Sequence, residues 1–195
     1  MKRSPLLIAL LLPAAAFAQG TRDLGAHEHG HSTLNIAFEG NRIAMELEAP
    51  GADITGFEYA ASSAEDRAKL EAAIAELSKP LSLFVLPEAA GCTVVSSTAG
   101  LHGAGEDHAG HDHEAHDHSE HEHGDDHAGH AEHAEFHAEY MLTCDNPAAI
   151  DRIEFTYFQT FPNAQEVDVQ MISDMGAQGF EVTRDAPVLD LSGLI

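Results

Sequence analysis

The chain has 195 residues, and its 33 aspartates and glutamates outnumber its nine lysines and arginines, which gives a formal net charge of −24. Such a charge repels nucleic acids and anionic lipid surfaces, so neither is expected as a partner. The length is enough for one modest domain with a single core. Much of the negative charge lies between Glu106 and Glu135, interleaved with histidine.

The first eighteen residues have the three parts of a secretory signal peptide. Lys2 and Arg3 give a positive start, residues 6–17 are apolar, and Ala16-Phe17-Ala18 is a small-residue cleavage site. The apolar run is shorter than the about 20 residues that a permanent membrane helix needs. We therefore expect cleavage after Ala18 and export of residues 19–195 as a soluble protein with no membrane contact.

Alternating apolar residues predict a β-hairpin early in this domain. The apolar positions of residues 34–38 and 43–47 fall on one face, and Gly40-Asn41 provides a two-residue turn. A helix is expected next, because Ser63 begins a sequence similar to a capping box and apolar residues recur at helical spacing from 70 to 77.

Short strands are expected at residues 81–86 and 92–95, and another at 140–144. Residues 150–161 fit either a helical stripe or a strand, and we favour the helix. Residues 167–172 and 180–183 predict a second hairpin. The expected fold is a small single α+β domain of β-hairpins packed with two helices, interrupted by a long His-rich loop.

That loop spans residues 101–135. After Leu101 it contains no leucine, isoleucine, valine or aromatic residue. Such a segment cannot bury enough apolar surface to offset the entropy of ordering, so we expect it to be disordered without a ligand. Long structureless loops inside compact domains usually have a function.

Cys92 and Cys144 are the only two cysteines, and they flank the His-rich loop. In an oxidising compartment an even pair predicts a disulfide. Closing a loop of this size would stabilise the fold by roughly 4 kcal/mol on the chain-entropy model. The alternative is that both cysteines serve as thiolate zinc ligands.

Twelve of the fifteen histidines lie between residues 102 and 137, many at two-residue or three- to four-residue spacing. Imidazole is a ligand for zinc, nickel and copper, and two imidazoles at such spacing can share one ion. The predicted metal ligands in and beside the loop are His102, His108, His111, His113, His116, His118, His121, His123, His127, His130, His133 and His137. The alternative is a solvating loop whose histidines bind nothing.

Several ions of moderate affinity are expected to bind. Zn²⁺ is the first choice because it is the commonest partner of imidazole and carboxylate in structural and catalytic sites. Ni²⁺ is the second choice and Cu²⁺ the third, and both are expected to bind in vitro. The methionines do not cluster, so a thioether copper(I) site is poorly supported.

Residues 27–31, His-Glu-His-Gly-His, match the H-E-x-x-H pattern of zinc proteases. That pattern needs a rigid helix, whereas here it contains a glycine and runs into a strand pattern. We interpret it instead as H-x-H-x-H, with His27, His29 and His31 on one face of a strand. No nucleophile constellation is present elsewhere, so we expect no enzymatic activity. A tight metal site is expected at these histidines, completed by a loop-end histidine such as His137; the alternative is a frayed terminus.

The segment HEHGHSTLNIAFEGNRIAMELEAPGADITGFE resembles the start of the ZrgA-like family of periplasmic zinc-binding proteins, and LFVLPEAAGC, AEYMLTC and FPNAQEVDVQM continue the resemblance. It implies a periplasmic protein that binds zinc and cooperates with a high-affinity uptake transporter. It also matches His27, His29, His31 and the loop histidines to the metal-binding stretches of the family, and it favours zinc over nickel.

Together these observations predict a periplasmic protein that captures or buffers zinc and delivers it to the solute-binding protein of a transporter. Two alternatives stay open. One is a metal-responsive interaction module, or zinc sensor, whose loop folds on metal and switches binding to a partner. The other is a protein that binds or stores nickel.

Overall fold

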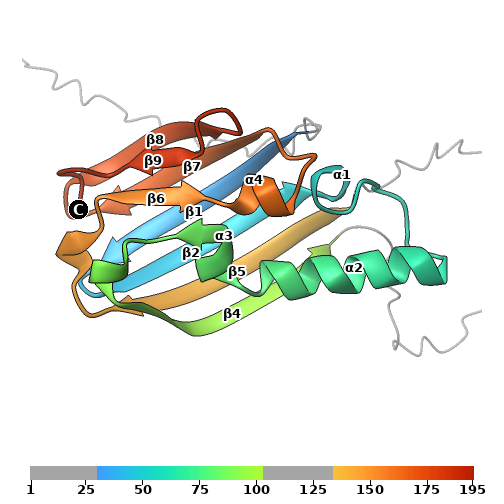
Figure 1. Cartoon of the computed structure of the whole chain (residues 1–195), viewed down its shortest axis with the longest axis horizontal. Helices are drawn as coiled ribbons and strands as arrows, with labels where there is room; N and C mark the ends of the chain where they lie inside the picture. The colour runs from blue at the N-terminus through green and yellow to red at the C-terminus, as the bar shows by residue number, and fades with distance from the viewer. Residues whose placement is uncertain (1–29, 103–133) are drawn as a thin grey trace, which may run out of the picture.

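The protein is described from a computed structural model, which covers residues 30–102 and 134–195. Its elements form two layers: a large sheet, and a group of short helices with a small sheet packed on it (Figure 1). The strands of the large sheet are β1 (His31–Glu39), β2 (Arg42–Pro50), β4 (Cys92–His102), β5 (Glu135–Cys144), β7 (Glu166–Ser173) and β8 (Gly176–Thr183).

The second layer contains a three-stranded sheet and the helices. Its strands are β3 (Phe84–Val85), β6 (Arg152–Phe155) and β9 (Val188–Asp190). The helices of the structure are α1 (Gly51–Ile54), α2 (Ala64–Leu77), α3 (Pro80–Leu83) and α4 (Tyr157–Thr160), with 3₁₀ turns at η1 (Glu88–Ala90) and η2 (Pro147–Ala149).

The large sheet has the strand order β4-β5-β2-β1-β7-β8. All neighbouring strands are antiparallel except β1 and β7, which run parallel with His31 opposite Glu166. A parallel pair requires a long crossover, and here nearly the whole chain between the two hairpins serves as that connection. The parallel pair therefore joins the beginning of the chain to its last third.

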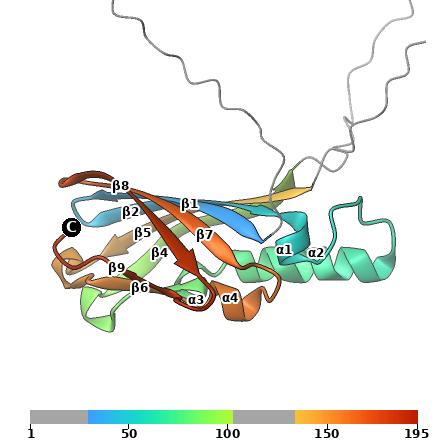
Figure 2. The same cartoon turned by 90° about the horizontal axis from the view of Figure 1, so that it is seen from above.

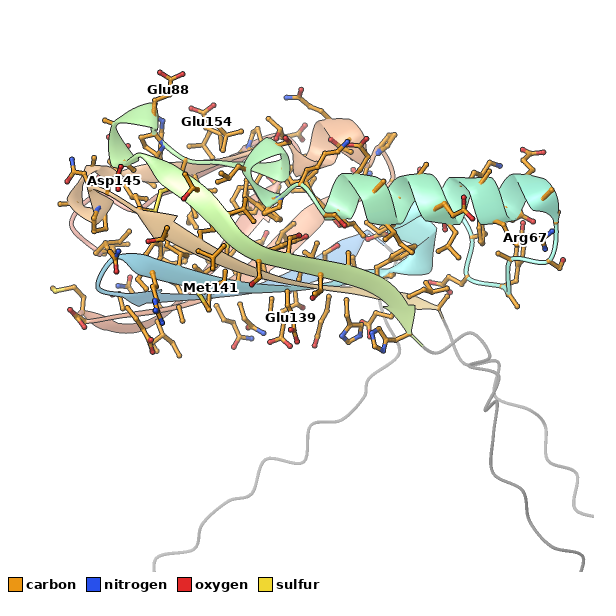
Figure 3. All side chains as sticks on the ribbon, turned by 90° about the horizontal axis from the view of Figure 1, so that it is seen from below. Arg67, Glu88, Glu139, Met141, Asp145 and Glu154 are labelled. Carbon is orange, nitrogen blue, oxygen red and sulfur yellow. A yellow bond between two sulfur atoms is a disulfide. The ribbon has the colours of Figure 1, made fainter. Side chains whose placement is uncertain are left out.

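Within residues 30–102 and 134–195, the second layer covers one face of the large sheet, as Figure 2 shows from above. On β1, the alternating residues Leu34, Ile36 and Phe38 are buried beneath the second layer, and the neighbouring strands repeat this pattern. The opposite face carries small and polar residues together with Met141 and Ile172, and it forms a shallow hollow. Glu139 and Met141 of β5 lie on this open face, on the side away from α2 (Figure 3).

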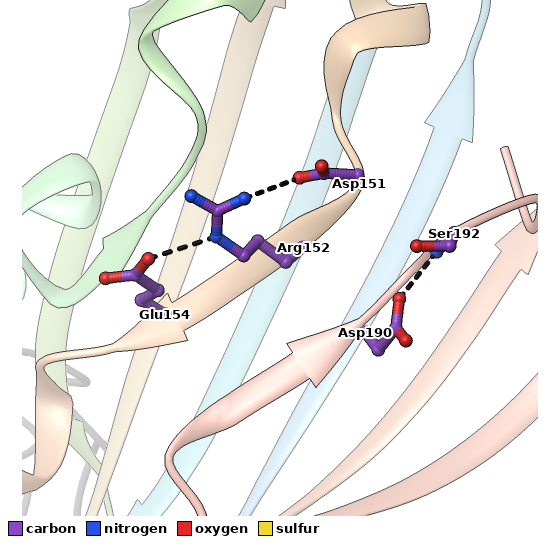
Figure 4. A network of polar contacts seen from close by, with 5 residues as sticks. All are labelled: Asp151, Arg152, Glu154, Asp190 and Ser192. Carbon is purple, nitrogen blue, oxygen red and sulfur yellow. Dashed lines mark hydrogen bonds and ion pairs between the residues drawn. The ribbon is translucent and has the colours of Figure 1, made fainter.

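Aromatic side chains fill the space between the two layers. Phe84 packs edge-on against Phe155 and is stacked at 6.0 Å on Tyr157, and all three side chains are fully buried. On the outside of the small sheet, Arg152 donates hydrogen bonds to Asp151 and Glu154 (Figure 4). Because these ion pairs are exposed, they contribute little to stability.

The first hairpin, the second hairpin and the Ser63-capped helix are confirmed. Ser63 Oγ accepts a hydrogen bond from the backbone N–H of Asp66, as expected for an N-cap, and α2 ends at Leu77. The disulfide is also confirmed: Cys92 and Cys144 are bonded at opposite positions of β4 and β5.

The helix expected at residues 150–161 is wrong for its first half. Arg152–Phe155 forms β6 between β3 and β9, and only Tyr157–Thr160 is helical. Ile153 and Phe155 alternate on a strand, and their pairing with β3 and β9 is a tertiary preference that the local pattern does not contain.

Two further boundaries differ from expectation. Residues 81–86 are divided between the end of α3 and the short strand β3, and β4 continues from Cys92 to His102 instead of ending at Val95. Consequently Leu101 and Glu135, which we assigned to the loop, are paired strand residues, opposite Phe136 and His102 respectively. The rest of the predicted loop, residues 103–133, and the predicted signal peptide lie outside the described residues. Among the described residues, no helix is long and apolar enough to cross a bilayer.

Candidate metal site

Each of the six strands of the large sheet has a terminus at the same end of the sheet. The register places His31 opposite Glu166, Pro50 opposite Glu135, Glu135 opposite His102, and Glu166 opposite Thr183. We call this end of the sheet the histidine end and define it by the strand-terminal residues His31, Pro50, His102, Glu135, Glu166 and Thr183. Both histidine-bearing stretches of the sequence therefore join the described fold at the same edge.

His31 lies there with two carboxylates of β7. One ligand atom from each of His31, Glu166 and Asp168 lies within 4.8 Å of the other two, and the Nδ1 atom of His31 is 3.4 Å from Oε1 of Glu166. All three side chains point to the open face, because His31 is the first residue of β1 and positions 166 and 168 alternate with the buried Val167. The site is thus a shallow surface cluster, open to solvent.

Gly30 fixes the register that brings these residues together. Its carbonyl accepts hydrogen bonds from the backbone N–H groups of Gln165 and Glu166, at 2.8 and 2.9 Å. Its own N–H donates to Oδ1 of the buried Asp53 at 2.7 Å. Gly30 has φ 93°, a backbone conformation that disfavours other residues, so the glycine is required at this junction.

The electrostatics of the cluster favour a cation. Partial burial raises the pKa of Glu166 above its ordinary value, and the neighbouring carboxylate of Glu181 raises it further, whereas His31 lowers it. Asp168 adds to this repulsion, since it lies directly opposite Glu181 in the β7–β8 pair. A divalent cation would offset the repulsion among these three carboxylates.

The donor set fits zinc. Ligands at about 2.0–2.2 Å from a tetrahedral zinc ion lie about 3.3–3.6 Å from one another, and the separation between His31 Nδ1 and Glu166 Oε1 falls in that range. One imidazole and two carboxylates are ligands that zinc accepts. Three protein ligands on an exposed surface leave a fourth position for water or for a ligand from an acceptor protein.

Two more of the predicted histidines lie elsewhere at the histidine end. The rings of His102 on β4 and His137 on β5 have centroids 4.6 Å apart, and Nε2 of His137 is 2.8 Å from Oε2 of Glu135. We expected a loop-end histidine such as His137 to complete the His31 site. The structure groups His31 with carboxylates of β7, because β2 separates β1 from β5.

Other predicted metal ligands cannot be placed. His27, His29 and the ten histidines from 108 to 133 lie outside the described residues. At the end of the HEHGH motif, the positive φ of Gly30 and the strand that begins at His31 are not helical. This is not the backbone that an H-E-x-x-H protease motif needs at its second histidine.

Sequence reasoning missed Glu166, Asp168 and Glu181. The alternation of acids with valine in residues 166–169 marks a strand with an acidic face. No local signal, however, indicates that this strand pairs in parallel with β1. That long-range pairing is what turns an ordinary polar face into a partner for His31.

Comparison with known protein families agrees with this donor set. The model of the ZrgA family of zinc uptake proteins matches residues 26–191, which includes all the described strands. The chain belongs to the ZrgA family. A comparison with curated proteins found no match. The family resemblance read from the sequence is thus confirmed, and its description as a zinc uptake family makes zinc the metal expected at the histidine end.

Proposed function

We propose that this ZrgA-family protein is exported to the periplasm, captures or buffers zinc there, and delivers it to the solute-binding protein of a zinc-uptake transporter. Zinc is the cargo, and the protein performs no catalysis. The observation that carries the proposal is the cluster of His31, Glu166 and Asp168 at the histidine end, in a chain of a zinc uptake family.

The exposure of this site supports transfer better than storage. The side chain of His31 is 41% exposed and that of Glu166 is 21% exposed, so an acceptor protein could reach a bound ion. Three protein ligands also leave an open coordination position, through which an incoming ligand can bind before the first ones leave. A buried four-ligand site would not allow this.

The test is zinc binding by calorimetry and chelator competition, on residues 19–195 and on variants. A first variant replaces residues 103–133 by Gly-Ser-Gly, which reconnects β4 and β5 as a hairpin with a short loop. We expect the tight site at His31 to survive this replacement and the ions bound by the insert to be lost. If all tight binding disappears, the insert itself is the tight site and the proposed role of His31 is wrong.

The second variant tests the ligands of the tight site directly. Glu166→Gln should weaken the surviving site by at least about 100-fold, the upper end of what loss of an outer-sphere partner costs. Glu88→Gln is the matched control, because Glu88 is an exposed carboxylate in η1, far from the histidine end (Figure 3). Equal affinity of the two variants would show that Glu166 is not a ligand.

Imidazole ligation also predicts a pH dependence. Zinc needs the neutral ring, so affinity should fall as the pH is lowered through about 6.5, the ordinary pKa of histidine. Affinity that is unchanged between pH 5 and 7.5 would contradict ligation by histidine.

Delivery is tested by mixing the zinc-loaded protein with the zinc-free solute-binding protein of the transporter and measuring the metal content of each after separation. Zinc on the acceptor supports delivery. A complex that forms only with the zinc-loaded protein, without metal transfer, would favour the metal-responsive interaction module instead.

A further inference from the structure

We infer that His102 and His137 form a second zinc site at the histidine end, with Glu139 as carboxylate ligand and Glu135 as the group that orients His137. The inference rests on the proposed zinc-binding function and adds a separate site to it. Its starting observation is the contact between two imidazole rings, whose centroids are 4.6 Å apart and whose planes are inclined by 53°. Two imidazoles at this distance on an exposed surface can bind one ion together.

The sequence of β4 explains why the two rings meet. Gly100 is the residue opposite His137 in the β4–β5 pair, and it has no side chain to occupy the space beside that ring. A Cβ atom at Gly100 would lie 4.0 Å from Nε2 of His102. His102, two residues further along the same face, therefore extends back over Gly100 towards His137.

Glu135 prepares His137 for metal binding. Its Oε2 lies 2.8 Å from Nε2 of His137, so a proton on Nε2 is donated to the carboxylate. With the proton on Nε2, the nitrogen that remains for a metal ion is Nδ1. A carboxylate that accepts the second N–H of a zinc-bound histidine is the usual outer-sphere arrangement, because it fixes the tautomer and raises the basicity of the ligand.

Glu139 supplies the negative ligand. It is the next residue of β5 on the open face after His137, and it lines the same small hollow as His102 and His137. Glu139 is exposed and has freedom to rotate towards an ion held by the two rings. Two imidazoles and one carboxylate are a donor set that zinc binds, with water in the fourth position.

This site is distinct from the His31 cluster. The register places Thr33 of β1 opposite Glu48 of β2, and Glu48 opposite His137 of β5. His137 therefore lies two strands away from β1, which is about 10 Å in the plane of the sheet. One ion with ligands at about 2 Å does not use both sets in their present positions, so the fold is expected to hold two ions.

The test is an NMR zinc titration of residues 19–195 with ¹⁵N-labelled histidine, following the ring nitrogens of each histidine. His31→Ala, His102→Ala and His137→Ala assign the signals, and Glu88→Gln, at an exposed position of η1, is the control. We expect the rings of His102 and His137 to shift together, with zinc on Nδ1 of His137. In His102→Ala the shift of His137 should move to higher zinc concentration, whereas Glu88→Gln should leave it unchanged.

A second variant separates ligation from folding. Glu135→Gln keeps an acceptor for the ring N–H but removes its charge, and it should weaken zinc binding at His137 by about tenfold to 100-fold without changing the shift of His31. If the ring nitrogens of His137 do not shift with zinc, or shift identically in His102→Ala, the second site does not exist. The proposed role of the His31 site would still stand if His31 responds to zinc, and it would be wrong if His31 does not respond.

Discussion

At the scale of single residues, the His31 site brings the carboxylates of Glu166, Asp168 and Glu181 close together. Asp168 and Glu181 face each other across β7 and β8, and like charges in directly opposite positions cost roughly 0.2–1 kcal/mol. Burial, followed by the charge of Glu181, raises the pKa of Glu166. The folded zinc-free protein therefore binds a proton at Glu166 more readily than the unfolded chain does. The contribution of Glu166 to stability should therefore fall as pH rises from about 4.3, the ordinary value for glutamate, through its raised pKa.

Glu181→Gln tests whether this repulsion raises the pKa of Glu166 and lowers the stability of the zinc-free protein. Removing the charge should lower the pKa of Glu166 and raise the zinc-free free energy of unfolding at pH 7 by roughly 0.2–1 kcal/mol. It should also flatten the loss of stability with rising pH, because one cause of the raised pKa is gone. Thermal unfolding between pH 4 and 8 without zinc measures both effects, with Glu88→Gln as control. A less stable variant at pH 7 would show that Glu181 is not a source of repulsion.

His31 could be predicted as a metal ligand from the sequence, because a run of histidines beside a strand is hard to explain by any role other than metal binding. Its partners could not, since Glu166 is 135 residues away in the chain and carboxylates on an exposed strand face are common. The residue type thus predicts that a histidine is a metal ligand, but only the pairing of β1 with β7 predicts which carboxylates lie beside it.

At the scale of elements, alternation and turn residues were sufficient for the two hairpins and for α2, whose patterns are local. They failed at residues 152–155, where strand and helix patterns overlap and where pairing with β3 and β9 decides the outcome. The short helix α1 was also not expected. It carries Asp53, which is 1% exposed and accepts a hydrogen bond from Gly30 at the start of β1. Through Gly30, α1 is connected to the β1–β7 junction that carries the proposed zinc site.

We therefore expect Asp53→Ala to weaken zinc binding at His31 as well as to lower the stability. Leaving the buried N–H of Gly30 without this acceptor should cost about 1–3 kcal/mol of unfolding free energy. Asp53→Asn, which retains an oxygen acceptor, should have the smaller effect. Both substitutions are made in the variant that has Gly-Ser-Gly in place of residues 103–133. Urea unfolding then measures the stability, and a zinc titration measures the affinity of the His31 site.

Tyr140→Phe is the matched control for this prediction. The hydroxyl of Tyr140 donates a buried hydrogen bond to the carbonyl of Leu77, at 2.8 Å, on the covered face of the sheet. Its loss should lower stability to a similar extent and leave the zinc affinity of the His31 site unchanged. If both variants lose zinc affinity equally, Asp53 acts only through general stability and does not position His31.

At the scale of the whole molecule, the topology brings the two histidine-bearing stretches of the sequence to one edge. His31 begins β1, His102 ends β4 and Glu135 begins β5, so the insert leaves and rejoins the fold at the same end of the sheet as the start of β1. The disulfide lies at the other end of the same two strands, where Cys92 is opposite Cys144. The cross-link therefore closes the loop that contains the insert without occupying the histidine end.

This arrangement makes the effect of the disulfide depend on the insert. The two cysteines are 52 residues apart, for which the chain-entropy model gives about 4 kcal/mol of stabilisation. Replacing both by serine should lower the free energy of unfolding by about that amount. In the variant with Gly-Ser-Gly in place of residues 103–133, the closed loop is less than half as long, and the loss should be smaller by somewhat under 1 kcal/mol. Urea unfolding of the four proteins, with and without each change, measures this difference as a double-mutant cycle. A loss that does not depend on the insert would mean that the disulfide stabilises β4 and β5 locally, and that the unfolded insert does not behave as a flexible chain.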